Sequence, residues 1–243
     1  MASSHPSAKE CEICGTRTTC FFSKVLNPED LLDLQVHRTL FELKKGEFLF
    51  REGETARGIW IICNGVVKMY RQTAVEGKPL ITRISRSGEL MGYRSFFADQ
   101  PYQGNAEAMV KTTASHLDRN YVHNLIFRNG PLALLLLQKF ARDLGRAEVV
   151  ATNMAYRGAK DRVVDVIYDL HMNTPNAEVD DHWAFNIRRQ DLAELAGLTI
   201  ETTVRVLKEL EKDGLLVIDR HQIKVLEPDQ IRRSDDDLIG LKR

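Results

Sequence analysis

Three cysteines near the N-terminus are the residues of this sequence best suited to chemistry. Cys11, Cys14 and Cys20 are spaced C-x2-C-x5-C, and thiolates this close can share an iron–sulfur cluster whose fourth ligand comes from elsewhere. That ligand would be Cys63, the remaining cysteine, a histidine, or an external group. Zinc also accepts three cysteines and a histidine, while a cysteine on an apolar strand is often only a small core residue. The spacing leaves three alternatives: an iron–sulfur cluster, no metal, and zinc or a disulfide.

A second set of side chains is suited to reading DNA. At about 100° per residue, a helix over residues 200–212 places Glu201, Val204, Arg205, Lys208 and Lys212 on one face. In a major groove an arginine can bind guanine through two hydrogen bonds, a glutamate can accept from cytosine, and a valine can contact a thymine methyl. The predicted DNA-contacting residues are Arg189, Thr199, Glu201, Thr202, Val204, Arg205 and Lys208.

The elements that would position this face form a helix-turn-helix with a wing. A short helix over residues 189–196 is followed by Gly197 as the turn, by Thr199 as the cap of the second helix, and by Gly214 as its end. The strands 215–218 and 222–225, joined at Arg220 and His221, would form the wing. Residues expected to point into the core are Leu192, Leu195, Ala196, Thr203, Val206, Leu207 and Leu210. A surface helix with solvated charges is the alternative interpretation.

The region before the helices has the pattern of a β-rich sensor domain. Short apolar runs at 59–62 and 66–70 alternate with glycine-containing turns, which is typical of a barrel, sandwich or β-roll. Asn64 and Gly65 lie between these two runs, and this dipeptide predicts a hairpin because both residues tolerate positive φ. Cys63 would then lie in that hairpin.

A long helix is expected next, beginning with Asn129 as cap and Pro131 in its first turn, and ending near Gly158. Apolar residues recur along it at spacings of four and three, with small alanines that allow two helices to approach closely. We therefore expect a dimer seam, although short heptad runs also pack within one chain. The seam residues are Ala133, Leu137, Phe140, Leu144, Ala147, Ala151 and Met154. An amphipathic helix over 159–170 and a loop containing Pro175 lead to the helix-turn-helix.

The expected fold class is α+β, with a jelly-roll-like double-stranded β-helix (β-roll), a long dimerisation helix and a winged helix-turn-helix. The expected division is 1–26 (cysteine segment), 27–128 (β-roll), 129–157 (dimerisation helix), 158–230 (DNA-binding domain) and 231–243 (tail). No apolar run in the 243 residues is long enough to cross a membrane, so we expect a cytoplasmic protein. The motifs of common enzyme sites are absent from the sequence, and no enzymatic activity is expected.

The formal net charge is zero, and the helix-turn-helix region has equal numbers of basic and acidic residues. Since charge alone does not favour nucleic acid, DNA recognition must depend on a few well-placed contacts in a dimer. A protein-binding adaptor with the same winged helix stays an alternative.

The segments RQDLA at 189–193 and GLTIETTVR at 197–205 resemble the helix-turn-helix signature of the cyclic-AMP receptor/fumarate–nitrate regulator (CRP/FNR) family. The resemblance covers nearly the whole chain. It implies a transcription regulator, an activator by our expectation, that binds as a homodimer to an inverted repeat with half-sites like TTGAT or TTGAC. Glu201 and Arg205 match the family's base-reading pair. Val204 stands where the oxygen-sensing branch has serine, which leaves open the base preferred at the outermost position of the half-site.

RNA polymerase is a further expected partner, through the segment 85–100.

The resemblance also bears on the sensed signal. Family members that bind cyclic nucleotides use an Arg-Ser pair, whereas the matching stretch here is GNAEA at 104–108, and Glu107 would repel a phosphate. Cyclic AMP is therefore not expected. The oxygen-sensing branch uses the C-x2-C-x5-C spacing for three ligands of a [4Fe–4S] cluster, which would fix the N-terminal segment against the dimer helix. That branch has its fourth cysteine just before the dimer helix, and the resemblance makes His116 the matching position and the alternative fourth ligand to Cys63. Oxygen would destroy such a cluster, loosen the dimer and lower DNA affinity. Other members are free of cofactors or respond to small ligands.

Overall fold

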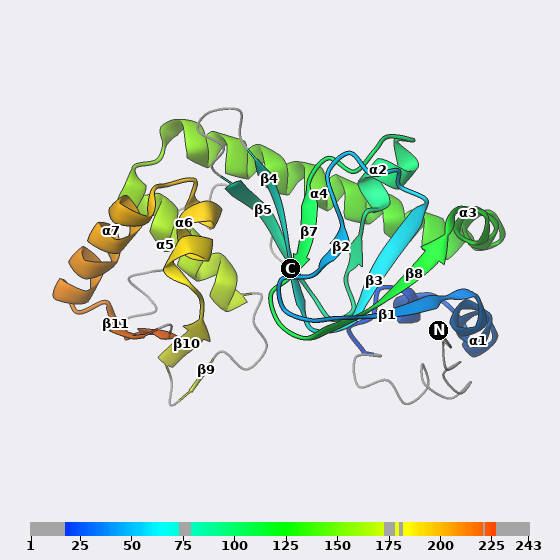
Figure 1. Cartoon of the computed structure of the whole chain (residues 1–243), viewed down its shortest axis with the longest axis horizontal. Helices are drawn as coiled ribbons and strands as arrows, with labels where there is room; N and C mark the ends of the chain where they lie inside the picture. Colours follow the sequence, from blue (N-terminus) through cyan, green and yellow to red (C-terminus); the bar gives the residue numbers. More distant parts are fainter. Residues whose placement is uncertain (1–17, 73–78, 173–177, 180–181, 221, 227–243) are drawn as a thin grey trace. The chain divides into compact units, whose positions relative to one another are not determined.

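The computed structural model describes residues 18–72, 79–172, 178–179, 182–220 and 222–226. The chain divides into two compact units, residues 1–145 and 146–243. The division falls inside the longest described helix, α4 (Gly130–Tyr156), so that each unit includes part of it (Figure 1). The finer domain boundaries expected from the sequence stay a prediction.

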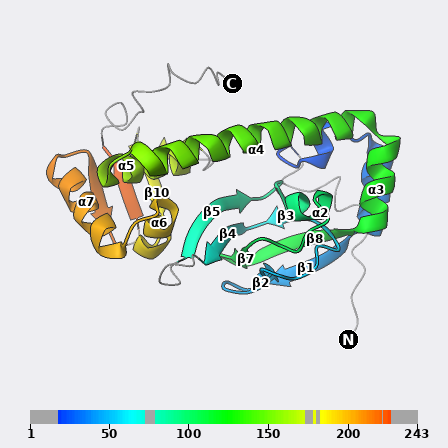
Figure 2. The same ribbon diagram turned by 90° about the horizontal axis from the view of Figure 1, so that it is seen from above.

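The N-terminal unit is built on two antiparallel sheets of four strands (Figure 2). Their orders are β1-β8-β3-β6 and β2-β7-β4-β5, so strands distant in the chain are neighbours in each sheet. The strands are β1 (Thr39–Leu43), β2 (Phe48–Phe50), β3 (Gly58–Asn64), β4 (Val66–Gln72), β5 (Pro79–Arg86), β6 (Leu90–Met91), β7 (Asn105–Ala108) and β8 (Thr112–Asp118). This arrangement confirms the expected β-roll.

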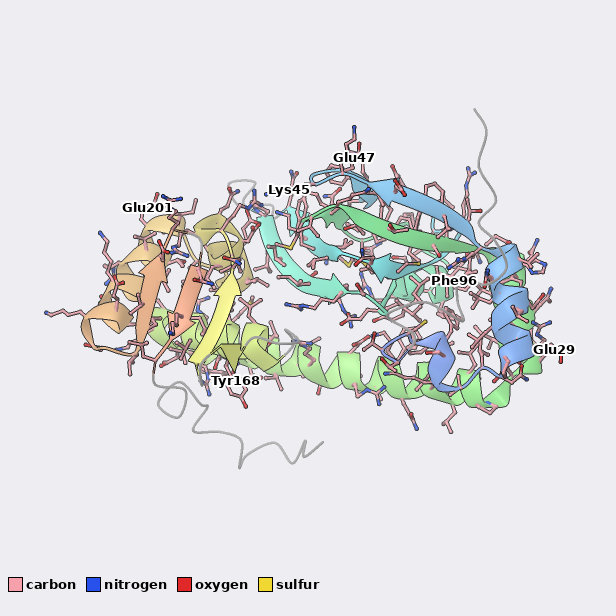
Figure 3. All side chains as sticks on the ribbon, turned by 90° about the horizontal axis from the view of Figure 1, so that it is seen from below. Glu29, Lys45, Glu47, Phe96, Tyr168 and Glu201 are labelled. Carbon is pink, nitrogen blue, oxygen red and sulfur yellow. The ribbon has the colours of Figure 1, made fainter. Side chains whose placement is uncertain are left out.

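The core of this unit contains apolar side chains from both sheets. Ile62 of β3, Leu90 of β6 and Leu117 of β8 have no exposed surface, and Val67 of β4 is equally buried from the other sheet. In β8 buried and partly exposed residues alternate over part of the strand, because successive side chains of a strand point to opposite faces. Phe96, labelled in Figure 3, lies in the same core.

The prediction of a hairpin at Asn64 and Gly65 is wrong. The two strands that flank this dipeptide, β3 and β4, belong to different sheets: β3 pairs with β8 and β6, and β4 with β5 and β7. Gly65 has a φ of 111°, and a Cβ atom there would lie 2.4 Å from Oγ1 of Thr112. The dipeptide is a tight turn between sheets, because this topology requires the chain to leave one sheet for the other.

Four short helices of the N-terminal unit are described: two precede the first strand, one lies between β6 and β7, and one follows β8. They are the 3-10 helix η1 (Phe22–Lys24), α1 (Pro28–His37), α2 (Tyr93–Phe97) and α3 (Arg119–Arg128). The Asn27 side chain caps α1 by accepting from the Asp30 amide at 2.8 Å. The hydroxyl of Tyr121 in α3 donates to Asp33 in α1 at 3.1 Å, which joins these two helices.

Helix α4 begins as predicted. The Asn129 side chain accepts a hydrogen bond from the Leu132 amide at 3.0 Å, which satisfies one of the unpaired donors of the first turn. Leu132 and Leu136 are buried in the core of the N-terminal unit. The helix ends at Tyr156, two residues before the glycine expected to end it.

The C-terminal unit combines helices with a four-stranded sheet of order β11-β12-β10-β9. Its further elements are α5 (Ala159–Met172), β9 (Glu178–Val179), β10 (His182–Asn186), α6 (Arg189–Ala196), α7 (Ile200–Lys212), β11 (Leu216–Asp219) and β12 (Gln222–Val225). Strand β10 pairs with β12 and was missed in the sequence, where we expected only a loop before the helix-turn-helix. Within the described ranges no helix is long and apolar enough to cross a bilayer.

Candidate nucleic-acid interface

The turn between α6 and α7 has the geometry expected from its sequence. Gly197 adopts the left-handed conformation, with φ 61° and ψ 39°, and ends α6. The Oγ1 atom of Thr199 then caps α7 by accepting from the amide of Thr202 at 3.2 Å. The Thr203 hydroxyl donates to the carbonyl of Thr199 at 3.0 Å. Thr199 and Thr202 therefore stabilise the first turn of α7.

Helix α7 has one buried and one exposed face. Thr203, Val206, Leu207 and Leu210 are buried, which confirms the core face expected from the sequence. Glu201, Arg205 and Lys208 are exposed, and Val204 is half-buried. Figure 3 shows Glu201 in the first turn of α7. The helix thus presents its predicted base-reading residues to solvent.

Arg205 is paired within its own helix. Its Nη1 atom lies 3.6 Å from Oε1 of Glu209, one turn later, and both side chains are largely exposed. Such a pair contributes only a few tenths of a kcal/mol in water. Glu209 was missed in the sequence, although its spacing of four residues from Arg205 is the usual signal for an ion pair in a helix.

Arg189, the first residue of α6, contacts the wing. Its Nη2 atom donates to the carbonyl of Arg220 at 2.9 Å, and partial burial lowers the pKa of its guanidinium while Glu211 opposes that shift. Within the described part of the chain its Nη1 atom is buried and has no hydrogen-bond partner. The structure thus gives Arg189 a role in positioning the wing, in addition to the predicted contact with DNA.

The wing is an antiparallel pair, β11 and β12, as expected. Arg220 follows β11 with a left-handed φ of 47°; His221, the other predicted turn residue, lies outside the described residues. The carboxylate of Glu211 in α7 accepts from the amide of Ile218 at 3.1 Å. The wing is therefore joined by hydrogen bonds to both helices of the helix-turn-helix.

Helix α6 contains a buried acidic residue that sequence reasoning missed. Asp191 is 1% exposed and accepts from Arg188 Nε at 2.6 Å and from Arg188 Nη2 at 2.8 Å. This bidentate geometry is the strong form of a charge-assisted hydrogen bond. Leu192 and Ala196 are buried as expected, whereas Leu195 is only half-buried.

The predicted dimer seam lies along α4, and most of it is accessible. Leu137 and Leu144 are 66% and 63% exposed. Ala147 and Ala151 are also exposed, and Ala133 and Met154 are half-buried. Phe140 differs from the rest, because its ring packs within its own chain. The centroid of this ring lies 5.3 Å from that of Tyr93 and 5.7 Å from that of Phe97.

The predicted metal ligands are only partly described. Cys11 and Cys14 lie outside the described residues. Cys20 and Cys63 are half-buried and pack against the core, and neither forms a disulfide within the described part of the chain. Each cysteine is adjacent in the sequence to a residue whose backbone is hydrogen-bonded to Gly88. Phe21, which follows Cys20, donates its amide to the Gly88 carbonyl, and Ile62, which precedes Cys63, accepts at its carbonyl from the Gly88 amide. The described residues include no group of three or more His, Cys, Asp or Glu able to hold a metal ion.

The alternative ligand, His116, is used in packing. Its ring lies against that of Trp60, with 4.7 Å between centroids, and burial lowers the pKa of its imidazole. The neighbouring Ser115 points to the other face of β8, where its hydroxyl is 3.1 Å from Sγ of Cys63.

A cluster of charged and phenolic groups joins the strands to α4. Arg83 of β5 donates to the Tyr93 hydroxyl at 2.7 Å, and Tyr93 donates to Asp143 of α4. Arg83 and Lys139 form ion pairs with Asp143 at 3.4 and 3.3 Å. Burial alone would raise the pKa of Asp143, but Arg83, the Tyr93 hydroxyl and Lys139 together hold it below its usual value.

Comparison with known proteins covers both units. A model of the cyclic nucleotide-binding domain matches residues 40–129, and a model of the Crp-like helix-turn-helix domain matches residues 161–234. Electron transport regulator A of Shewanella oneidensis is 24% identical over 229 residues, 90% of each chain. The fumarate and nitrate reduction regulatory protein of Vibrio cholerae is 22% identical, covering 93% of this chain and 94% of its own. The structure of FixK2 from Bradyrhizobium japonicum has a TM-score of 0.70 at 23% identity, over 80% of this chain and 95% of that one.

The fold and the exposed face of α7 define a transcription regulator with a β-roll sensor domain and a DNA-binding helix-turn-helix. Since both domain models match in this order and the matches to the two relatives span about nine-tenths of the chain, the assignment covers both domains. The chain belongs to the CRP/FNR family.

Proposed function

We propose that this regulator binds, as a homodimer, to an inverted-repeat operator and reads each half-site with Glu201 and Arg205. The observation that carries the proposal is the exposure of both side chains on a capped helix whose opposite face is buried. The N-terminal residues of such a helix reach base edges in a major groove. Lys208, also exposed, would contact phosphate or base, and RNA polymerase would be the further partner.

The apolar surface of α4 supports the homodimer. Leu134, Leu137 and Leu144 are each more than half exposed, although burying a leucine side chain contributes about 2 kcal/mol. Along a helix these positions fall on one side, and small residues at Ala147 and Ala151 allow a second helix to approach. A second copy of the same helix would cover this surface.

An Arg205→Ala variant tests DNA reading. We expect the preference for the cognate base pair over a substituted one to fall by about tenfold or more, since one bidentate contact contributes roughly 1–3 kcal/mol of discrimination. Sites selected from random DNA, followed by binding measurements at fixed salt, provide the readout. Equal binding of wild-type protein and variant to all duplexes would support a protein-binding adaptor instead.

We further propose that the signal sensed by this regulator is oxygen, through a [4Fe–4S] cluster held by Cys11, Cys14, Cys20 and Cys63. The thiol set fits this cluster. Cys20 and Cys63 both adjoin the backbone around Gly88, whereas the His116 ring is packed on Trp60, which favours Cys63 over His116. When bound, the cluster would supply an oxygen-sensitive group. The chain itself contributes four thiolates and a half-buried setting for two of them.

Anaerobic purification with iron and sulfide analysis tests this part. We expect about four irons per chain and a visible absorption band that bleaches in air. A Cys63→Ser variant should lose iron, while His116→Gln should keep it. Protein that contains neither iron nor the band would exclude the cluster, and zinc in its place would establish the alternative metal.

The charged cluster on α4 favours a second candidate, a regulator that needs no cofactor. Arg83 and Tyr93 of the sensor domain already contact Asp143 of α4 through the chain's own side chains. Such contacts could hold the dimer helix without a bound ligand. The same iron analysis separates the two candidates.

A further inference from the structure

Glu209 borders the DNA-reading face of α7. It follows Arg205 by four residues, and its Oε1 atom lies 3.6 Å from Nη1 of that arginine. Side chains in a helix lean toward its N-terminus, so the Glu209 carboxylate leans toward the turn that contains Arg205. Glu209 is 47% exposed and Arg205 68% exposed, which leaves both able to meet DNA.

The charge of Glu209 also acts on a lysine of α5. Lys160, near the start of α5, forms an ion pair with Asp213 at 2.9 Å, and the negative charge of Glu209 adds to that of Asp213 in raising the pKa of Lys160. The Lys160–Asp213 pair connects α5 with the end of α7, and the charge of Glu209 also favours the protonated form of Lys160.

The surroundings of this pair would change on DNA binding. In water an exposed pair at this spacing contributes little, but a major groove excludes part of the water and strengthens charge interactions. A carboxylate that faced phosphates alone would weaken binding to every sequence. Paired with Arg205, it instead limits the directions in which the guanidinium can point, which favours the two parallel hydrogen bonds to guanine.

We propose that Glu209 is a specificity-determining residue that positions Arg205 for guanine, at some cost in affinity for DNA of any sequence. The inference rests on the proposed function, because it requires α7 to read bases. It adds a residue outside the face formed by Glu201, Val204, Arg205 and Lys208.

A Glu209→Gln variant of the full-length chain tests the proposal. Binding is measured to duplexes that carry the selected inverted repeat, and to the same duplexes with the guanine read by Arg205 replaced by adenine. We expect affinity for unrelated DNA to rise, and the preference for guanine to fall by about three- to fivefold. Asp219→Asn is the matched control, since it removes one exposed negative charge from the wing. It should change all affinities by a similar factor and leave the preference unchanged.

A Glu209→Asp variant gives a further readout. It keeps the charge on a side chain shorter by one methylene, and we expect it to recover part of the lost preference. If Glu209→Gln and Asp219→Asn shift the affinities for both duplexes equally, Glu209 does not position Arg205. That result is distinct from failure of the proposed function, in which the wild-type protein shows no preference and Arg205→Ala changes nothing.

Discussion

His116 illustrates how one side chain can be suited to two roles. As an isolated residue it is a candidate metal ligand, but in the structure its ring packs on Trp60 and it is partly withdrawn from water. Burial lowers the pKa of its imidazole, and the nearby Asp118 opposes the shift only partly. The neutral form is therefore favoured in the folded protein.

This pKa shift predicts a pH dependence of stability. Because the folded-state pKa lies below the unfolded one, the unfolded state binds more protons as the pH falls. The stabilisation is present above the usual histidine pKa and is lost as the pH falls through the folded value. Urea unfolding between pH 7.5 and about 5 should show a smaller loss of stability for His116→Gln than for the wild-type protein. Identical pH profiles would show that His116 does not titrate in this way.

At the scale of elements, one carboxylate of α4 contributes a polar contact that the apolar packing of this helix does not replace. Asp143 accepts hydrogen bonds from Arg83 and Tyr93 and pairs with Lys139. Without its charge, two partly buried cations would face each other. The half of α4 that belongs to the N-terminal unit is thus held by Asp143 as well as by the buried Leu132 and Leu136.

We predict that Asp143→Asn lowers the free energy of unfolding by about 1–3 kcal/mol, because it leaves Arg83 and Lys139 without their shared anion. Equilibrium unfolding in urea measures the change. Asp99→Asn is the control, since Asp99 also pairs with an arginine, Arg119, but is 85% exposed; it should have little effect. Equal losses for both variants would contradict the special role of Asp143.

At the scale of the whole molecule, the proposed function requires a second copy of the chain. One helix-turn-helix reads one half-site, and two half-sites bound together gain affinity because the second contact becomes intramolecular. The exposed leucines of α4 are the surface on which we propose that the two copies associate.

Leu144→Glu tests this dependence. A charge in the centre of the seam should convert the dimer to a monomer in sedimentation experiments and weaken binding to the inverted repeat by about tenfold or more. Val36→Glu, on α1 and 76% exposed, is the control and should leave both properties unchanged. A Leu144→Glu protein that remains dimeric would place the dimer interface elsewhere.

Local patterns predicted much of the candidate site. The buried and exposed faces of α7 follow from the helical period, the cap at Thr199 from its hydroxyl, and the turn at Gly197 from its freedom to adopt positive φ. The cap of α4 at Asn129 follows in the same way. Each of these depends on residues within a few positions of one another.

Contacts between distant segments could not be predicted in this way. The contact of Arg189 with the carbonyl of Arg220 joins residues 31 positions apart, and Tyr93 and Asp143 are 50 positions apart. The turn at Asn64 and Gly65 shows the same limit, because its residues predict a turn but not which strands will pair.

The sequence by itself determined the helix-turn-helix, the exposed face of α7, the β-rich first half and the family membership suggested by the motif at 189–205. Only the tertiary structure decided the pairing of β3 and β4 with other strands, the packing of Phe140 and His116, and the attachment of the wing to Arg189 and Glu211. The physical reason is range: helix periodicity, caps and positive φ are properties of a few consecutive residues, whereas these contacts form only when the whole chain packs.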